Sequence, residues 1–153
     1  MKPPQIIVVD LDGTLCDTNH RVDYAQAGEW DAYHSRIAAD RAHLDVSRLI
    51  SHMVSDNAPD WEVWLISGRE DKWLLETQRW LAARDIVADR ILLRPAHDRS
   101  PDHELKLRLL VEALGSMEAV IDHVAFVLED KDRVVEAYRN AGLPCWQVRI
   151  GIY

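Results

Sequence analysis

The sequence contains five short apolar runs, each of which ends where polar residues begin. The runs cover residues 5–9, 61–66, 90–93, 123–128 and 145–149. Continuous apolar runs of this length are typical of strands that are buried on both faces of a parallel sheet. Because helical patterns separate the runs, we expect an α/β fold with right-handed crossovers. The predicted architecture is a Rossmann-like three-layer sandwich, in which helices cover both faces of a central parallel sheet of about five strands.

Three segments around these runs are expected to be helices, residues 70–84, 101–115 and 131–141. In the second helix, Ser100 has the place of an N-cap and Pro101 that of the first helical residue. Tryptophans in the first helix and in the strands fall on core positions and are expected to pack inside the protein; they are Trp64, Trp73, Trp80 and Trp146.

The link between the first two strands, residues 16–60, is too long for a simple crossover. Within it, residues 29–39 and 44–54 have helical patterns. We interpret this link as a small helical elaboration, or minimal cap, that overhangs the strand ends. Residues 1–153 then form one domain, which a chain of this length favours.

The charged residues limit the partners of the chain. It has 26 Asp and Glu against 18 Lys and Arg, which gives a net charge of −8 with histidine neutral. Since nucleic-acid backbones attract basic surfaces, this charge argues against a broad nucleic-acid-binding face.

No apolar stretch approaches the roughly 20 residues that span a bilayer. Two distant cysteines, Cys16 and Cys145, form no Cys-x-x-Cys pair, so we expect a reduced, cytoplasmic protein without a membrane partner.

Polar residues gather where the predicted strands end. In open α/β sheets, ligands bind outside the carboxyl ends of the strands. Asp10 and Asp12 follow the first predicted strand, and Ser67 follows the second. Lys106 lies one loop after the third strand, and Glu129 and Asp130 follow the fourth. The fold is expected to bring all six side chains to one edge of the sheet.

The run Asp10-Leu11-Asp12-Gly13-Thr14-Leu15 indicates phosphoryl chemistry. A carboxylate such as Asp10 can attack phosphorus and form an aspartyl phosphate. A second carboxylate, Asp12, can protonate the leaving oxygen and later activate water. Gly13 permits the sharp turn between the strand and the site. The alternative, a simple Asx-rich turn after a strand, does not account for the other polar groups at the sheet edge.

Two neighbouring carboxylates repel each other unless a cation lies between them. Mg²⁺ prefers hard oxygen ligands. The candidate ligands are the side chains of Asp10 and Asp130 and the backbone carbonyl of Asp12.

Several groups are candidates to bind the phosphoryl oxygens. Ser67 and the backbone of Gly68, ahead of a helix, could form a phosphate site, and a plain N-cap is the alternative. Lys106 could add its ammonium group or be a solvated helix lysine. Arg69 could bind phosphate bidentately or form a surface salt bridge. Arg94 and Arg99, on the loop after the third predicted strand, either extend a phosphate-binding path or balance the charges of Asp98 and Asp102.

These motifs resemble those of the haloacid dehalogenase (HAD) superfamily. The matches occur in family order and are Asp10 to Thr14, Ile66-Ser67-Gly68-Arg69, Lys106 and Glu129-Asp130. A narrower likeness is to the 3′-phosphatase domain of phage-type polynucleotide kinases and to related small phage phosphatases. It is carried by Ser67 to Glu70, by residues 92–95 and 101–106, and by residues 129–136 and 142–148. A phage origin would place the protein in the host cytoplasm.

The resemblance implies roles for individual residues. Asp10 is then the nucleophile, Asp12 the general acid and base, and Lys106 a catalytic cation. The phosphate-binding residues would be Thr14, Ser67, Gly68, Arg69 and Arg21. The Mg²⁺ site would comprise Asp10, Asp12, Asp130 and Glu129, although position 129 is Asp in the kinase-linked domains. No Gly-x-x-x-x-Gly-Lys-Ser/Thr motif, and hence no kinase half, is present.

The sequence leaves three functions open. The leading one is a Mg²⁺-dependent phosphatase that removes phosphate from a nucleic-acid 3′ end. A nucleoside monophosphate phosphatase is the second, which the charge of −8 favours. A non-catalytic binding module is the third, and the presence of both Asp10 and Asp12 disfavours it. Trp30, in the elaboration, could stack on a base or only pack. Whether the chain forms a homo-oligomer is also left open.

Overall fold

The computed structural model describes residues 4–54 and 60–151, and its centre is a five-stranded parallel sheet. The strand order is β5-β4-β1-β6-β7, and every neighbouring pair is parallel. The strands are β1 (Gln5–Asp10), β4 (Trp61–Glu70), β5 (Arg90–Arg94), β6 (Val124–Glu129) and β7 (Cys145–Gln147). The predicted central sheet is therefore confirmed.

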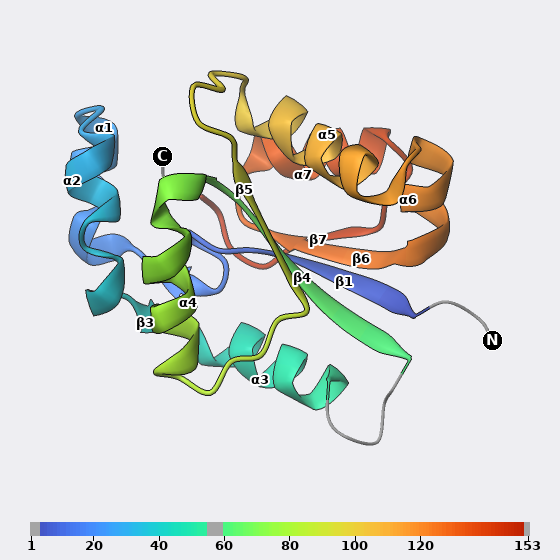
Figure 1. The fold of residues 1–153 in the computed structure, drawn as a ribbon, viewed down its shortest axis with the longest axis horizontal. Helices are drawn as coiled ribbons and strands as arrows, with labels where there is room; N and C mark the ends of the chain where they lie inside the picture. Colours follow the sequence, from blue (N-terminus) through green and yellow to red (C-terminus); the bar gives the residue numbers. More distant parts are fainter. Residues whose placement is uncertain (1–3, 55–59, 152–153) are drawn as a thin grey trace.

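Both faces of the sheet are buried, as the continuous apolar runs predict. In β1, Ile6 and Val8 pack on one face, while Ile7 and Val9 pack on the other. The helices on the first face are α5 (Asp102–Leu114), α6 (Met117–His123) and α7 (Asp132–Asn140), and those on the second are α3 (Leu44–Met53) and α4 (Leu74–Ala82) (Figure 1). The result is a three-layer α/β sandwich.

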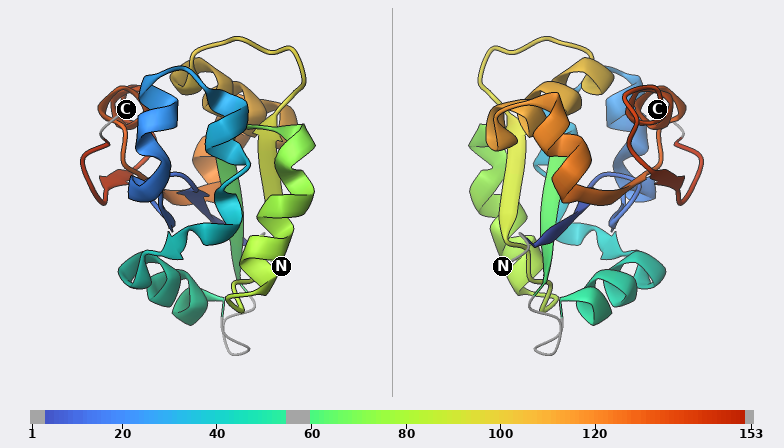
Figure 2. Two further views of the ribbon diagram at one scale, coloured as in Figure 1. Left: turned by 90° about the vertical axis from the view of Figure 1, so that its left-hand side faces the viewer. Right: turned by 90° about the vertical axis from the view of Figure 1, so that its right-hand side faces the viewer.

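The elaboration contains more elements than the two predicted helices. They are β2 (Cys16–Asp17), η1 (Asn19–Arg21), α1 (Val22–Gln26), α2 (Trp30–His34), η2 (Ile37–Ala39), β3 (Arg41–Ala42) and α3. The predicted helix 29–39 is thus split into α2 and η2, and an unpredicted antiparallel pair joins β2 to β3. In Figure 2, α1 and α2 stand at the end of the sheet where β1 finishes. Residues 55–59 of the predicted elaboration lie outside the described residues.

Several predicted boundaries were wrong. Strand β4 continues through Glu70, because its pairing with β5 extends to Glu70 and Arg94, and helix α4 starts only at Leu74 after the 3₁₀ turn η3 (Asp71–Trp73). Helix α5 starts at Asp102 with Pro101 as its N-cap, so Ser100 is one residue too early. Strand β7 ends at Gln147 rather than at 149.

Helix α6 and the exposure of Trp146 are two further differences from the sequence-based prediction. Helix α6 was not predicted; its N-cap Ser116 accepts a hydrogen bond from the backbone N–H of Ala119 at 3.1 Å. Trp146 is 54% exposed, because β7 is an edge strand, whereas Trp64 and Trp80 are buried as expected. Within the described residues, no helix is long and apolar enough to cross a membrane.

Candidate active site

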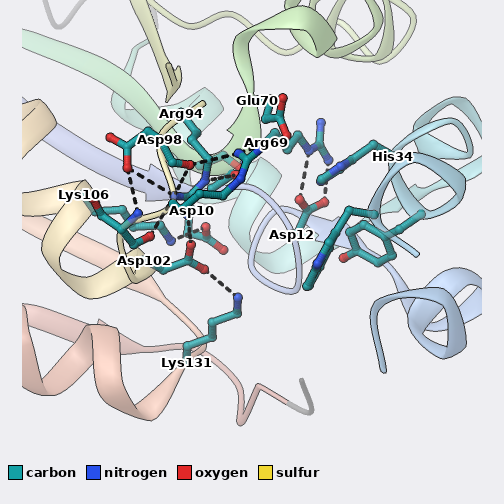
Figure 3. Close-up of a pocket in the computed structure, with 16 residues that line it drawn as sticks. Asp10, Asp12, His34, Arg69, Glu70, Arg94, Asp98, Asp102, Lys106 and Lys131 are labelled. Carbon is teal, nitrogen blue, oxygen red and sulfur yellow. Dashed lines mark hydrogen bonds and ion pairs between the residues drawn. The ribbon is translucent and has the colours of Figure 1, made fainter. Parts of the chain in front are cut away.

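A pocket of about 360 Å³ opens at the carboxyl ends of the central strands (Figure 3). Its lining comes from β1, β4, α2, the loop after β5 and the start of α5. Six predicted site residues from distant parts of the sequence line this pocket, namely Asp10, Asp12, Ser67, Gly68, Arg69 and Lys106. The structure therefore brings these groups together at one sheet edge.

A tight turn after β1 sets the two carboxylates of the motif. Asp10 is the last residue of β1 and is buried. The carbonyl oxygen of Leu11 accepts backbone hydrogen bonds from residues 14, 15 and 16 at 2.8–3.2 Å. Gly13 has a φ of +87°, a conformation that side chains disfavour. The turn holds Asp12 at the pocket beside Asp10.

Lys106 is buried and lies between two carboxylates. Its Nζ donates to Oδ1 of Asp10 at 2.7 Å and to Oε2 of Glu129 at 2.6 Å. Burial acts to lower the pKa of Lys106, but Asp10 and Glu129 outweigh it and raise that pKa well above its ordinary value. Lys106 is therefore a fixed cation, and the alternative of a solvated helix lysine was wrong.

Asp130 completes a group that carries more negative than positive charge. Oxygen atoms of Asp10, Glu129 and Asp130 lie within 4.8 Å of one another. Burial and the charge of Glu129 raise the pKa of Asp10 to about 7, and burial and the charge of Asp10 raise that of Asp130 to about 9. Among the described residues, Oδ2 of Asp10 is buried without a hydrogen-bond partner. Asp10, Lys106, Glu129 and Asp130 form what we call the lysine cluster, and its three carboxylates could hold a metal ion.

Asp12 belongs to a second group, which balances its charges. Its carboxylate accepts hydrogen bonds from Arg21 Nη2 at 2.6 Å and from Arg69 Nε and Nη2 at 2.9 and 2.6 Å. Asp40, in the elaboration, accepts from Arg21 Nε and Nη2 at 2.7 and 2.5 Å. Burial favours the neutral form of Asp12, but Arg69 and Arg21 outweigh it and hold its pKa below the usual range. Asp12, Arg21, Asp40 and Arg69 form what we call the arginine cluster.

The two predicted phosphate-binding arginines differ in access. Arg69 lines the pocket, whereas Arg21 is fully buried and lies outside the lining. The Arg21 guanidinium sits 3.9 Å from the ring centre of Tyr33 and donates to the Tyr33 carbonyl oxygen at 3.3 Å. Since both guanidinium groups are engaged by carboxylates here, phosphate binding by either stays a prediction. Among the described residues, Arg69 is buried and pairs with Asp12 and Asp40, so the alternative of a surface salt bridge with Glu70 or Asp71 was wrong.

The remaining predicted phosphate ligands occupy different places. Ser67 and Gly68 line the pocket but lie within β4, so they are not directly ahead of a helix as expected. A Cβ on Gly68 would come within 2.5 Å of Oδ1 of Asp102, which explains the absence of a side chain there. Thr14 is buried outside the pocket lining, and its hydroxyl donates to Oδ1 of Asp130 at 3.4 Å.

Sequence reasoning missed Asp40, and it named Asp102 only as a charge partner, not as part of the pocket lining. Asp40 has no motif around it, and its place is revealed by its two bonds to Arg21 and by the contact of its Oδ1 with His20 Nε2 at 2.7 Å. Asp102 accepts from Arg94 Nη2 at 2.6 Å and from Lys131 Nζ at 2.8 Å. Although burial opposes the charge, Lys131 and other cations lower the pKa of Asp102 to about 2. Arg94 thus balances the charge of Asp102, and because it also lines the pocket, its part in a phosphate-binding path stays a prediction.

Comparisons with known proteins identify relatives of the chain. The sequence model described as the polynucleotide kinase PNKP phosphatase domain matches residues 4–153. A putative bifunctional polynucleotide kinase/RNA ligase of Autographa californica nuclear polyhedrosis virus is 28% identical over 144 residues, which is 94% of this chain and 19% of that protein. The chain therefore spans a minor part of this curated relative.

Solved structures give the same result. A chain of the Pnkp1/Rnl/Hen1 complex is 29% identical, with a TM-score of 0.78, over 99% of this chain and 48% of that one. A hydrolase from Streptococcus pneumoniae TIGR4 shares the fold, with a TM-score of 0.57 and 17% identity over 98% of this chain and 95% of that one. With the family match over nearly the whole chain, these findings show that the chain has a HAD-type fold and belongs to the family of polynucleotide kinase phosphatase domains.

Proposed function

We propose that the chain is a Mg²⁺-dependent phosphomonoesterase that acts through an aspartyl phosphate on Asp10 and removes phosphate from a nucleic-acid 3′ end. The observation that carries this proposal is the lysine cluster, in which a buried carboxylate at the pocket is held by Lys106 through one oxygen only. Membership in a phosphatase-domain family supports the same reaction class.

The lysine cluster fits a divalent cation. Three carboxylates face one ammonium group, and Oδ2 of Asp10 has no hydrogen bond among the described residues. Asp10 and Asp130 would hold Mg²⁺, with Glu129 beside them and the backbone carbonyl of Asp12 as a further candidate. When bound, the ion would neutralise charge on the phosphoryl group.

The residues of the chain account for a two-step reaction. A carboxylate oxygen of Asp10 attacks phosphorus, the bond from phosphorus to the 3′ oxygen breaks, and Asp12 gives that oxygen a proton. Asp12 then takes a proton from water, whose oxygen attacks phosphorus and releases inorganic phosphate and free Asp10. Lys106 stabilises the negative charge of the phosphoryl oxygens and fixes Asp10.

The arginine cluster suits the second of these steps. Arg21 and Arg69 hold Asp12 as a carboxylate, which is the form that accepts a proton from water. The first step needs Asp12 to carry a proton. We therefore expect the entering phosphate to draw the pocket-lining Arg69 away from Asp12, which makes the neutral form of Asp12 more favourable.

The nucleic-acid end is the favoured substrate because the relatives are named for polynucleotide kinase. A second candidate is a free mononucleotide, which the net charge of −8 favours because a long polyanion would be repelled.

A substrate panel tests both candidates. Phosphate release is measured from a 3′-phosphorylated oligonucleotide, from nucleoside 3′- and 5′-monophosphates and from a sugar phosphate, with Mg²⁺ or with EDTA. The proposal expects the oligonucleotide to have the highest kcat/KM, and both EDTA and Asp10→Asn to abolish release. Preference for mononucleotides would support the second candidate, and turnover of neither nucleotide class would refute both.

A further inference from the structure

We propose that the pocket contains a nucleobase subsite, in which the indole of Trp30 stacks on the terminal base of the substrate whose phosphate lies at Asp10. This inference rests on the proposed function and specifies which part of the nucleic-acid end is recognised. Trp30 begins helix α2 in the elaboration and lines the pocket.

Trp30 is exposed although it is a large apolar side chain in a well-packed aromatic group. It remains 50% accessible to solvent. Its ring stacks on His34, with 6.3 Å between centroids and 28° between planes, and meets the edge of Tyr33 at 5.8 Å and 84°. A ring that stacks on one side and stays half exposed offers its other face to a ligand. Every nucleobase has a face that can stack on such a ring.

The rings behind Trp30 are fixed. His34 and Tyr33 are buried, with 5.0 Å between their ring centroids, and His34 also contacts the ring of Trp73 at 5.9 Å. Burial lowers the pKa of His34 to about 4, so its ring is neutral at pH 7. Tyr33, His34 and Trp73 therefore form an uncharged aromatic wall behind Trp30, which suits a base better than a phosphate.

The position of the wall agrees with the direction in which the leaving group must lie. In Figure 3, Lys106 and Asp102 occupy one side of the pocket, and Asp12 lies toward the side of His34. The leaving oxygen has to contact Asp12, so the nucleoside that carries it extends from Asp12 toward α2. The volume of about 360 Å³ lies within the range of small-molecule sites, so the pocket has room for more than the phosphoryl group.

The chain offers a matched control in Trp146. This tryptophan is 54% exposed and stacks on Phe126 at 4.5 Å and 8°, but it lies on β7 outside the pocket lining. Replacing either tryptophan removes a half-exposed ring from an aromatic stack. Only the Trp30 replacement should alter substrate recognition.

The test compares Trp30→Ala, Trp30→Phe and Trp146→Ala on two substrates. One is a 3′-phosphorylated oligonucleotide, and the other is the same oligonucleotide with a terminal nucleotide that lacks its base. We expect Trp30→Ala to raise KM for the first by about tenfold or more, with kcat within a few-fold of wild type. Trp30→Phe should recover most of the affinity, and Trp146→Ala should match wild type.

The base-less substrate makes the result decisive. The wild-type protein should bind the base-less substrate as weakly as Trp30→Ala binds the intact one. The Trp30→Ala substitution should not weaken binding of the base-less substrate any further. An equal loss on both substrates, or no loss on either, would overturn the subsite. If the wild type releases phosphate only from small non-nucleotide esters, the proposed function fails instead.

Discussion

The lysine cluster and the arginine cluster are buried at the same pocket but treat charge in opposite ways. In the lysine cluster, three carboxylates share the single ammonium group of Lys106, and the pKa values of Asp10 and Asp130 are raised. In the arginine cluster, Asp12 and Asp40 face Arg21 and Arg69, and the pKa of Asp12 is lowered. The lysine cluster has three acidic groups for one cation, whereas the arginine cluster has two acidic groups and two cations.

This difference separates the site for a metal ion and the phosphoryl group from the group that sets the charge and position of Asp12. A buried surplus of negative charge is costly unless a cation compensates it. The lysine cluster therefore has the charge of a metal and phosphoryl site. The arginine cluster needs no further ion, and through Arg21 and Asp40 it ties the elaboration to the motif carboxylate Asp12. The following predictions test this division, from the largest expected effect to the smallest.

Replacing Asp10 should have the largest effect. Asp10→Asn removes the attacking carboxylate while it keeps the size of the side chain, so we expect kcat to fall by about 10³-fold or more. Phosphate release from a 3′-phosphorylated oligonucleotide measures this, with circular dichroism to show that the variant is folded. A folded variant with wild-type activity would refute the mechanism.

Replacing Asp40 should damage stability and activity together. Asp40→Asn removes one negative charge of the balanced cluster and leaves Asp12 as the carboxylate that is hydrogen-bonded to the buried Arg21. This change is expected to cost about 3 kcal/mol of unfolding free energy. Because Arg21 also holds Asp12, kcat should fall about 10²-fold. Urea unfolding and steady-state kinetics measure the two effects.

The control for this variant is Asp31→Asn. Asp31 forms an exposed ion pair with Lys72 at 2.7 Å, and solvent-exposed pairs of this kind contribute little to stability. If the Asp40 and Asp31 variants were equally stable, the arginine cluster would not be the support that we describe.

Mg²⁺ should stabilise the protein through the lysine cluster. At about 100 times its dissociation constant, a bound ion adds about 2.7 kcal/mol to the unfolding free energy. In EDTA near pH 7, Asp130→Asn should be more stable than wild type, because the buried Asp130 carboxyl, whose pKa is raised to about 9, must take up a proton on folding and asparagine does not. The variant should also gain little from Mg²⁺. Thermal unfolding of both proteins in EDTA and in Mg²⁺ measures this. Equal gains from Mg²⁺ in the two proteins would place the ion elsewhere.

The aromatic wall next to the arginine cluster should make the fold sensitive to acid. Burial lowers the pKa of His34 from 6.5 to about 4, so between these values the unfolded chain binds a proton that the folded chain does not. Stability therefore falls as the pH drops through this window, and we expect this group to account for about 2 kcal/mol. Urea unfolding at about pH 7 and pH 4.5 should show a smaller loss for His34→Leu than for wild type. The same loss in both proteins would contradict the assignment.

The lysine cluster could be predicted from the sequence, and the arginine cluster only in part. Asp10, Lys106 and Asp130 each follow a strand or its loop, and the topology of a parallel sheet brings such positions together whatever the details. Asp40 lies between short elements of the elaboration, where neither periodicity nor a motif marks it. Its contacts depend on the path of residues 16–43, which is set by tertiary packing.

Burial was the other property that the sequence did not reveal. Arg69 follows a recognisable strand end, but nothing in its neighbours shows that it is almost fully buried against Asp12. The strand continues past Ser67 because β5 extends alongside it, and pairing of this kind is invisible to local patterns. Trp146 was misplaced for the same reason, since an edge strand and a central strand have similar sequences.

The most direct test of the division between the clusters is the site of the covalent intermediate. The protein is mixed with a 3′-phosphorylated oligonucleotide and Mg²⁺, quenched in acid during turnover, and analysed by peptide mass spectrometry. The wild type should carry one phosphoryl group on Asp10, and Asp10→Asn should carry none. Asp12→Asn should accumulate more of the phosphorylated peptide than the wild type when the substitution slows hydrolysis more than it slows the attack by Asp10. Turnover without any modified peptide, or a phosphoryl group on another residue, would contradict the assignment of Asp10 as the nucleophile.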